Sequence, residues 1–213
     1  MNILITAFEA FNGESVNPAQ LATADLPEHI EHHPIDVLVI PTSFKDSVVA
    51  IESQLAKKTY DVVIAVGQAG GRSAITPERI AINIDDAVIP DNTGEQPINQ
   101  PIQPKGPAEY FSDLPVKRMV QRLREAGIPS ELSNTAGTFV CNHVMYQLAH
   151  LAKTSYPNMR TGFIHLPYAT EQLQGREKVP AMPVSTMTRG LMLAIQTAIQ
   201  FSEDSDGVLG TLS

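Results

Sequence analysis

The sequence has no tryptophan and only one cysteine among its 213 residues. A single cysteine cannot form an internal disulfide, and it excludes every zinc site that is built from several cysteines. Basic residues are also scarce, with 15 Lys and Arg against 23 Asp and Glu and a formal net charge of -8. Such an acidic surface repels phosphate backbones and anionic lipids, so we expect neither a nucleic-acid nor a membrane partner.

Long apolar segments are absent from the sequence as well. No apolar run is long enough to span a bilayer, and the first residues lack the basic, apolar and small-residue order of a signal peptide. We therefore expect a cytoplasmic protein, and a reducing compartment fits the lone cysteine. Hydrophobic residues make up 43% of the chain, which is enough for one well-buried core. The expected organisation is a single domain over residues 1–213.

Three apolar, β-branched runs at residues 2–8, 35–41 and 61–67 predict buried strands. Between the second and third, residues 42–58 have the pattern of a helix that Thr42 or Ser43 would cap. Strands that alternate with helices are typical of an α/β fold whose mostly parallel sheet is covered on both faces. In such sheets the ligand site lies at the carboxyl ends of the strands. Further helices are predicted at residues 114–127, after the cysteine, and at 184–201, and further strands at 79–90, 128–132 and 161–168.

The cysteine, Cys141, lies where a polar loop gives way to a predicted helix. Val144, Leu148 and Leu151 recur at spacings of four and three, which places them on one helical face. Free N–H groups and the positive dipole end at a helix start favour a thiolate and stabilise a neighbouring oxyanion. A lone cysteine is more often a small buried hydrophobe. The loop before it and a histidine downstream favour the interpretation as a nucleophile.

That histidine, His165, lies near the end of an apolar predicted strand, two residues before Pro167. A histidine in such a run is commonly a core residue with satisfied ring nitrogens. A strand end faces the site in this architecture, however, and there a neutral imidazole can deprotonate Cys141. His143 is the rival base, but residues two apart on a helix point in different directions.

A histidine that acts as a base needs a group that accepts its other ring N–H and orients it. The candidate carboxylates are Glu78, Asp85, Asp86 and Asp91, and spacing alone does not choose among them. The glycine-rich turn at residues 67–72 matches no phosphate-binding motif, so it predicts a tight turn. Its Gln68 can accept and donate hydrogen bonds at once, which suits a neutral amide-like ligand.

Taken together, these blocks resemble the type I pyroglutamyl peptidases, also called pyrrolidone carboxyl peptidases. The resemblance covers most of the chain and rests on the segments ILITAFEAF, PTSF, GQAGGR, ITPERIAINIDDAVIPDN, LPVK, SNTAGTFVCNHVMY and GFIHLPY. It implies a cytoplasmic cysteine exopeptidase that removes an N-terminal pyroglutamyl residue from peptides without a metal or cofactor. It also implies a single-domain three-layer α/β/α sandwich with a twisted, mostly parallel central sheet, assembled as a homodimer or homotetramer.

The resemblance assigns roles that spacing leaves open. It implies that Cys141 is the nucleophile, that His165 is the general base and acid, and that Glu78 orients the histidine. It further implies a pocket for the pyroglutamyl ring, and the matching residues are Phe8, Phe11, Thr42, Gln68, Ile89, Phe139 and Val140. Apolar walls and neutral amide partners suit a flat, uncharged lactam, and a pocket without a counterion disfavours a free α-ammonium group.

The sequence departs from the family pattern at two places. The family's TGFEPFGG is here TAFEAFNG, and its DDARIPDN is here DDAVIPDN, so Val88 replaces an arginine that the family keeps near the reacting centre. Valine supplies no positive charge for an oxyanion. The alternatives are a weakened enzyme, a substitute cation such as Arg72 or Arg79, or a family arginine that serves loop structure more than the transition state, and we favour the weakened enzyme. Two other classes stay open: a thiol hydrolase for another small amide or ester, and an inactive binding module of the same fold.

Overall fold

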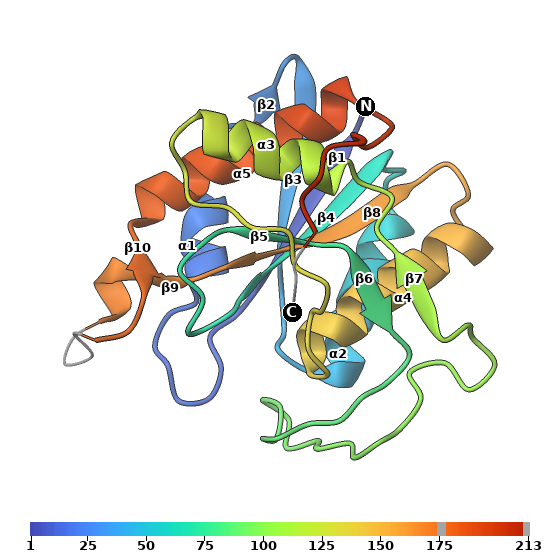
Figure 1. The fold of residues 1–213 in the computed structure, drawn as a ribbon. Helices are drawn as coiled ribbons and strands as arrows, with labels where there is room; N and C mark the ends of the chain where they lie inside the picture. Colours follow the sequence, from blue (N-terminus) through green and yellow to red (C-terminus); the bar gives the residue numbers. More distant parts are fainter. Residues whose placement is uncertain (174–177, 211–213) are drawn as a thin grey trace.

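The computed structural model describes residues 1–173 and 178–210, and a six-stranded sheet lies at its centre (Figure 1). In spatial order the strands are β2 (His29–Ile30), β3 (His33–Ile40), β1 (Ile3–Phe8), β4 (Val62–Gln68), β8 (Arg160–Leu166) and β5 (Thr76–Glu78). The four central strands are parallel, and β2 and β5 run antiparallel to their neighbours at the two edges. The predicted mostly parallel sheet is therefore confirmed.

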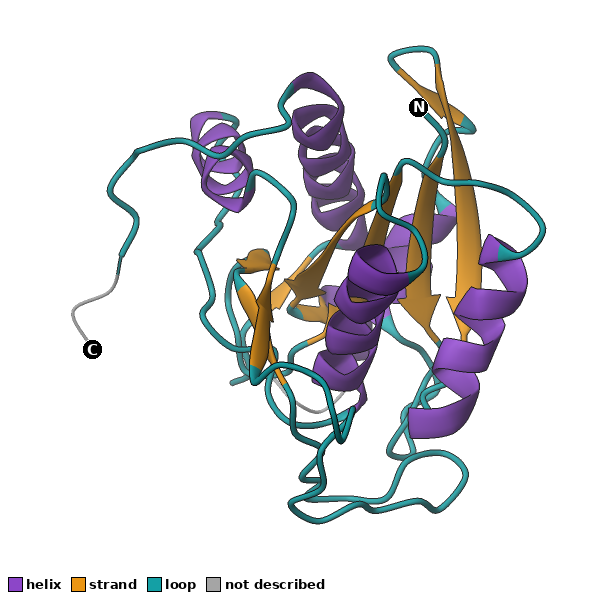
Figure 2. Ribbon diagram, turned by 90° about the vertical axis from the view of Figure 1, so that its right-hand side faces the viewer, coloured by secondary structure: helices purple, strands orange, loops and turns teal. Residues whose placement is uncertain are grey.

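Helices cover both faces of this sheet (Figure 2). One face packs against α1 (Pro18–Ala24), α3 (Val116–Glu125) and α5 (Val184–Gln200), and the other against α2 (Phe44–Leu55) and α4 (Val140–Thr154). The strand β1 shows why: all six of its residues are buried, which requires an apolar layer on each side. The predicted three-layer α/β/α fold is confirmed.

Two helix ends follow local rules that the sequence carries. The Ser43 side chain accepts a hydrogen bond from the Asp46 N–H, so Ser43 rather than Thr42 caps α2. Gly127 has φ of +72°, a conformation that glycine adopts without strain, and it ends α3 where the pattern predicted. The helix α1 was not predicted, although Asn17 caps it and Pro18 occupies its first position.

Two predicted strands are wrong in part. The segment at 79–90 forms only β6 (Ile80–Ile82), which pairs with β7 (Glu109–Phe111), and the remainder is loop. The Asn142 side chain bonds the backbone of Ile82 and Ile84, so an amide takes the place of a neighbouring strand there. The segment at 128–132 forms only an isolated bridge between Ser130 and Ile75, in which the Ile75 N–H donates to Pro129 and the Ile75 carbonyl accepts from Glu131.

The remaining elements lie at the carboxyl end of the sheet. They are β9 (Tyr168–Ala169), the short 3-10 helix η1 (Thr170–Gln172) and β10 (Ala181–Met182), which pairs with β9. Among the described helices, none has the length and apolar character that crossing a membrane requires. The long connection between β6 and β7 extends from the lower side of the molecule in Figure 1.

Candidate active site

Cys141 is the second residue of α4, directly after a loop whose last residue, Phe139, precedes the helix. The Phe139 side chain makes no capping hydrogen bond, and the N–H groups of a first helical turn have no carbonyl partner within their helix. The predicted position of the thiol at a helix start is thus what the structure shows. These N–H groups can receive negative charge that develops beside the sulfur.

The thiol approaches the sheet at Gly67, near the carboxyl end of β4. A Cβ on Gly67 would lie 3.0 Å from the Cys141 Sγ and 2.8 Å from the Cζ of Phe163. Those distances are shorter than ordinary carbon contacts, so only glycine leaves room for the sulfur here. Gly67 is paired with His165 in the register of β4 and β8, and directly paired residues project to the same face of a sheet. The imidazole and the thiol therefore share one face at the same strand ends.

His165 is held by a buried carboxylate. Its Nδ1 lies 2.7 Å from the Oε1 of Glu78, and the side chains are 4% and 0% exposed. Glu78 reaches the histidine from β5, the edge strand next to β8. An ionised carboxylate accepts the Nδ1–H, which leaves Nε2 as the basic nitrogen. The Phe163 ring lies beside the imidazole, with ring centroids 4.7 Å apart.

The other three candidate carboxylates have different partners. Asp85 pairs with His143 at 2.8 Å, so the rival base points to a separate buried carboxylate. Asp91 accepts the N–H groups of Phe44, Thr93 and Glu95, and Asp86 accepts that of Asn99. Glu78 is therefore the one of the four that contacts His165.

Burial determines the resting protonation of this group. It lowers the pKa of His165, and the hydrogen bond and negative charge of Glu78 oppose that effect without overcoming it. Burial, followed by the charge of Glu78, raises the pKa of the Cys141 thiol to about 12, against the opposing effects of Arg72 and the thiol's own backbone N–H. The N–H groups at the helix start favour a thiolate, as the sequence indicates, but the opposing effect of burial on the thiol pKa is larger in the free protein. The resting pair is a neutral thiol and a neutral imidazole.

Part of the expected ring pocket forms an aromatic cluster beside the thiol. The Phe139 ring lies 6.1 Å from that of Phe11 and 5.4 Å, edge to face, from that of Phe44. Sequence reasoning missed Phe44, which stands in the quoted segment PTSF and reads only as a residue of a helix start. Phe11 and Phe139 are half-buried, so their rings retain exposed surface.

The remaining expected pocket residues lie at different depths. Phe8, Thr42 and Val140 are at most 3% exposed, so they offer a ligand almost no surface. The Thr42 N–H and hydroxyl donate hydrogen bonds to the side chain and the carbonyl of Glu9, and Phe8 packs on Phe163. The Gln68 Oε1 accepts a hydrogen bond from Gln172, while Ile89 is half-buried in the loop after β6.

The two departures from the family pattern have different structural outcomes. Asn12 adopts a φ of +53°, and asparagine tolerates this left-handed conformation better than most residues that could replace glycine. The Val88 side chain is 91% exposed, so it is not packed against the thiol. The expected substitute cations are engaged elsewhere: Arg72 bonds Glu78, and Arg79 lines a separate hollow beside Phe111.

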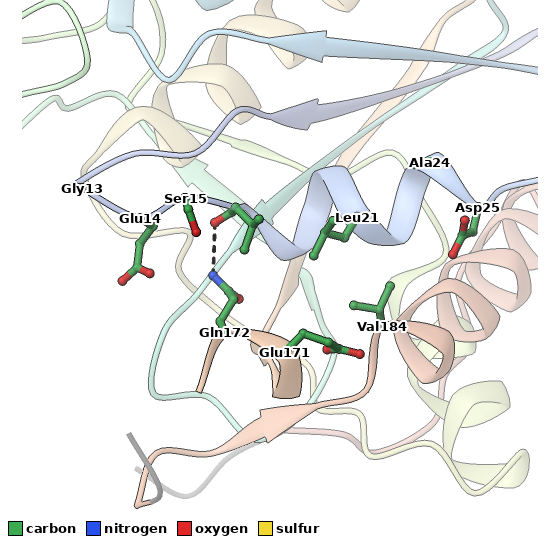
Figure 3. Close-up of a pocket in the computed structure, with 10 residues that line it drawn as sticks. Gly13, Glu14, Ser15, Leu21, Ala24, Asp25, Glu171, Gln172 and Val184 are labelled. Atoms are coloured by element: carbon green, nitrogen blue, oxygen red, sulfur yellow. Dashed lines mark hydrogen bonds between the residues drawn. The ribbon is translucent and has the colours of Figure 1, made fainter. Parts of the chain in front are cut away.

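A larger hollow of about 730 Å³ lies between the first loop and the segment around Gln172 (Figure 3). Leu21 of α1 and Val184 of α5 line it, so it opens on the side of the sheet opposite to α4. The Gln172 side chain donates a hydrogen bond to the Val16 carbonyl, drawn as the dashed line, and another to the Gln68 Oε1. The hollow contains none of the three candidate catalytic residues. Among the described residues, no cluster of three or more His, Cys, Asp or Glu side chains is arranged to hold a metal ion.

Comparisons with known proteins agree on one family. The pyroglutamyl peptidase family model matches residues 1–201. The pyrrolidone-carboxylate peptidase of Staphylococcus haemolyticus is 51% identical over 210 residues, 99% of each chain, and that of Levilactobacillus brevis is 51% identical over 199 residues, 93% of this chain and 98% of that protein. The crystal structure of Bacillus amyloliquefaciens pyroglutamyl peptidase I is similar with a TM-score of 0.91, 40% identity and coverage of 96% of this chain and 99% of that one. The structure of a variant of the Pyrococcus furiosus pyrrolidone carboxyl peptidase is similar with a TM-score of 0.88 and 39% identity, and the match covers 94% of this chain and 99% of that one.

These matches span nearly the whole chain and define its class, which is that of the cysteine-type hydrolases that act as peptidases. More particularly, the chain belongs to the pyroglutamyl peptidase family. The resemblance that the sequence motifs indicated is confirmed.

The contact at Gly67 predicts the effect of adding one methyl group there. In Gly67→Ala the new Cβ would displace the Cys141 sulfur and the Phe163 ring. A displacement near 1 Å can lower kcat/KM by about 10²-fold, measured with a pyroglutamyl coumarin amide. Gly162→Ala is the matched control, since its Cβ would overlap Leu114 on the opposite face. It should lower the melting temperature and keep kcat/KM within about threefold of wild type, because its strain lies in the core. Equal activity losses in both variants would contradict the role of Gly67.

The raised thiol pKa predicts how Cys141 reacts with iodoacetamide. Only the thiolate is alkylated, so the rate in the free protein should rise with pH up to about 10 without a plateau. Mass spectrometry of the cysteine peptide measures this rate, and protein in denaturant is the control, with an ordinary midpoint at about 8.5. A plateau at or below neutral pH in the folded protein would show a resting thiolate instead.

Proposed function

We propose that this protein hydrolyses the peptide bond after an N-terminal pyroglutamyl residue, with Cys141 as nucleophile, His165 as general base and acid, and Glu78 as the orienting carboxylate. The observation that carries the proposal is the 2.7 Å contact between His165 and Glu78 at the strand ends where the thiol meets Gly67. Membership of the pyroglutamyl peptidase family supplies the reaction. The thiol, the base and the carboxylate come from three different elements, α4, β8 and β5.

The neutral resting pair determines the first chemical step. The Nε2 of His165 takes the Cys141 proton as the sulfur attacks the scissile carbonyl, so the thiolate forms only with the substrate present. The oxygen of the tetrahedral intermediate gains the negative charge, and N–H groups at the start of α4 are positioned to donate to it. The imidazolium then protonates the leaving amine, the C–N bond breaks, and a pyroglutamyl thioester remains.

Hydrolysis of the thioester uses the same groups again. His165 removes a proton from a water molecule that attacks the acyl carbon, and it returns the proton to the departing sulfur. Glu78 stays ionised and keeps the imidazole in one tautomer and orientation throughout. The products are free pyroglutamate and a peptide that is shorter by one residue.

The residues around the thiol fit a small uncharged ring. Phe11 and Phe139, supported by Phe44, offer apolar surface for the faces of a lactam, and Gln68 offers an amide for its polar edge. We place Phe8, Thr42, Val140 and Ile89 in the same pocket as residues that shape it. No charged side chain belongs to this set, so a free α-ammonium group would lose its hydration without gaining a counterion.

We further propose that the protein acts in the cytoplasm as a homodimer or homotetramer. A reducing compartment keeps the essential thiol unoxidised. The exposed Val37 and Val39 on β3 support self-association, because β2 covers only the first residues of that strand. Exposed apolar strand surface is commonly buried in an assembly.

Replacement of the thiol tests the chemistry most simply. Cys141→Ala should abolish hydrolysis of pyroglutamyl coumarin amide, and Cys141→Ser should lose nearly all of it because a serine hydroxyl is a weaker nucleophile here. Both variants should keep the wild-type circular dichroism spectrum and bind pyroglutamate. Prolyl and glutaminyl coumarin amides serve as control substrates for the wild type. Preferred cleavage of either control, or more than trace activity in Cys141→Ala, would contradict the proposal.

The role of Glu78 predicts a change in kcat rather than KM. Glu78→Gln keeps the shape but favours the wrong imidazole tautomer, so kcat should fall by about 10² to 10⁴ with little change in KM. Asp86→Asn is the matched control, since that carboxylate is exposed and accepts only a backbone N–H. Steady-state kinetics on both variants measures the difference. An unchanged kcat in Glu78→Gln would rule out the proposed role of this carboxylate.

A further inference from the structure

The Oε1 atom of Glu78 is shared by two partners, His165 and Arg72. The Arg72 Nη1 bonds this oxygen and the hydroxyl of Thr76, while its Nη2 donates to the carbonyl of Thr135 at 3.1 Å. Thr135 lies in the loop that leads into α4 and Cys141. One guanidinium therefore connects the carboxylate that holds the histidine with the loop that carries the nucleophile.

Glu78 needs a permanent positive charge beside it. Its side chain is 0% exposed, and an isolated carboxylate in such a place is strongly disfavoured relative to its neutral form. His165 does not supply that charge in the resting state, because burial keeps the imidazole neutral. The Arg72 side chain is 29% exposed, so its charge remains partly hydrated while it contacts the buried oxygen. Arginine also stays protonated at every pH at which the protein is folded.

The turn at residues 67–72 explains how Arg72 reaches this position. Gly71 has φ of +91°, which turns the chain directly before the arginine. A Cβ on Gly70 would overlap the Tyr168 ring, so the turn lies against the segment after β8. The glycines thus direct a cation towards Glu78 and do not form a phosphate cradle.

We propose that Arg72 is a positioning residue of the reaction proposed above: its positive charge balances the buried carboxylate of Glu78 and holds it oriented towards His165, and it fixes the loop before Cys141. Its nitrogens are occupied by Thr76, Glu78 and Thr135, so it acts through these groups and not on the substrate. The inference rests on the proposed function, because it concerns the base of that reaction.

This role has a consequence for the pH dependence of the reaction. The charged or titratable groups that face His165 are Glu78 from β5, Arg72 from the turn after β4 and Cys141 from α4. The positive charge of Arg72 lowers the pKa of His165. Without this charge, the coupled pair of Glu78 and His165 takes up a proton at higher pH, and the reaction needs the pair without that proton. The acid limb of kcat/KM should therefore move to higher pH when the cation is lost.

The test compares Arg72→Gln with Arg79→Gln on the full chain, using pyroglutamyl coumarin amide. Arg79 lies one residue after Glu78 and lines a separate hollow, so its replacement removes the same charge without touching the carboxylate. Arg72→Gln should lower kcat by at least about tenfold and move the acid limb to higher pH, while Arg79→Gln keeps the wild-type profile. An unmoved acid limb in Arg72→Gln, or equal shifts in both variants, would overturn the proposal.

A double-mutant cycle covers the outcome in which Arg72→Gln does not fold. If the arginine acts by balancing the buried charge of Glu78, it has no such charge to balance in Glu78→Gln. Adding Arg72→Gln to that variant should therefore lower kcat and the melting temperature only slightly more. A folded double variant beside an unfolded single one supports the proposal. A double variant that also fails to fold, or equal losses in both backgrounds, contradicts it. If wild-type protein does not cleave the substrate, the proposed function is contradicted. Failure of the proposed function is thereby distinguished from failure of the Arg72 proposal.

Discussion

The close approach of α4 to β4 at Gly67 is the contact on which the site depends. The sulfur of Cys141 occupies the space that any other side chain at position 67 would fill. Strand register then places His165 beside that glycine, and the antiparallel edge strand β5 brings Glu78 to the far side of the imidazole. Parallel strands make this possible, because their carboxyl ends meet at one edge and the helix that follows the cysteine loop packs across them.

Burial gives this site a neutral resting state. Burial raises the pKa of the thiol and lowers that of the imidazole, so in the proposed mechanism proton transfer accompanies attack on a substrate. Within residues 1–173 and 178–210, the charged groups that act on the imidazole are the paired ions of Glu78 and Arg72. An uncharged pocket of this kind suits an N-terminal ring without an ammonium group, so the protonation of the catalytic pair and the choice of substrate follow from the same dry surroundings.

The sequence predicted the features that depend on local pattern. Apolar runs located β1, β3, β4 and β8 within a few residues, and Gly127 located the end of α3. Residue spacing could not choose the partner of His165, and only the family resemblance indicated it, because Glu78 lies 87 residues away and reaches the histidine through the pairing of β5 with β8. The pKa of Cys141 also escaped local reasoning, since a helix start lowers the pKa of a thiol and packing against the sheet raises it, and only the tertiary structure decides the balance. For the contact of Arg72 with the Glu78 oxygen that also binds His165, the sequence offered only an arginine after a glycine-rich turn.

In the mechanism that we propose, Cys141 forms a thioester with the pyroglutamyl group, and trapping this intermediate is the direct test. Protein quenched in acid during turnover of a pyroglutamyl ester should carry one added pyroglutamyl acyl group, which tandem mass spectrometry places on the peptide that contains Cys141. The acyl group should accumulate in the steady state, because an ester acylates the thiol faster than water hydrolyses the thioester. An acyl group on another residue, or rapid turnover by protein whose Cys141 is fully alkylated, would contradict the account.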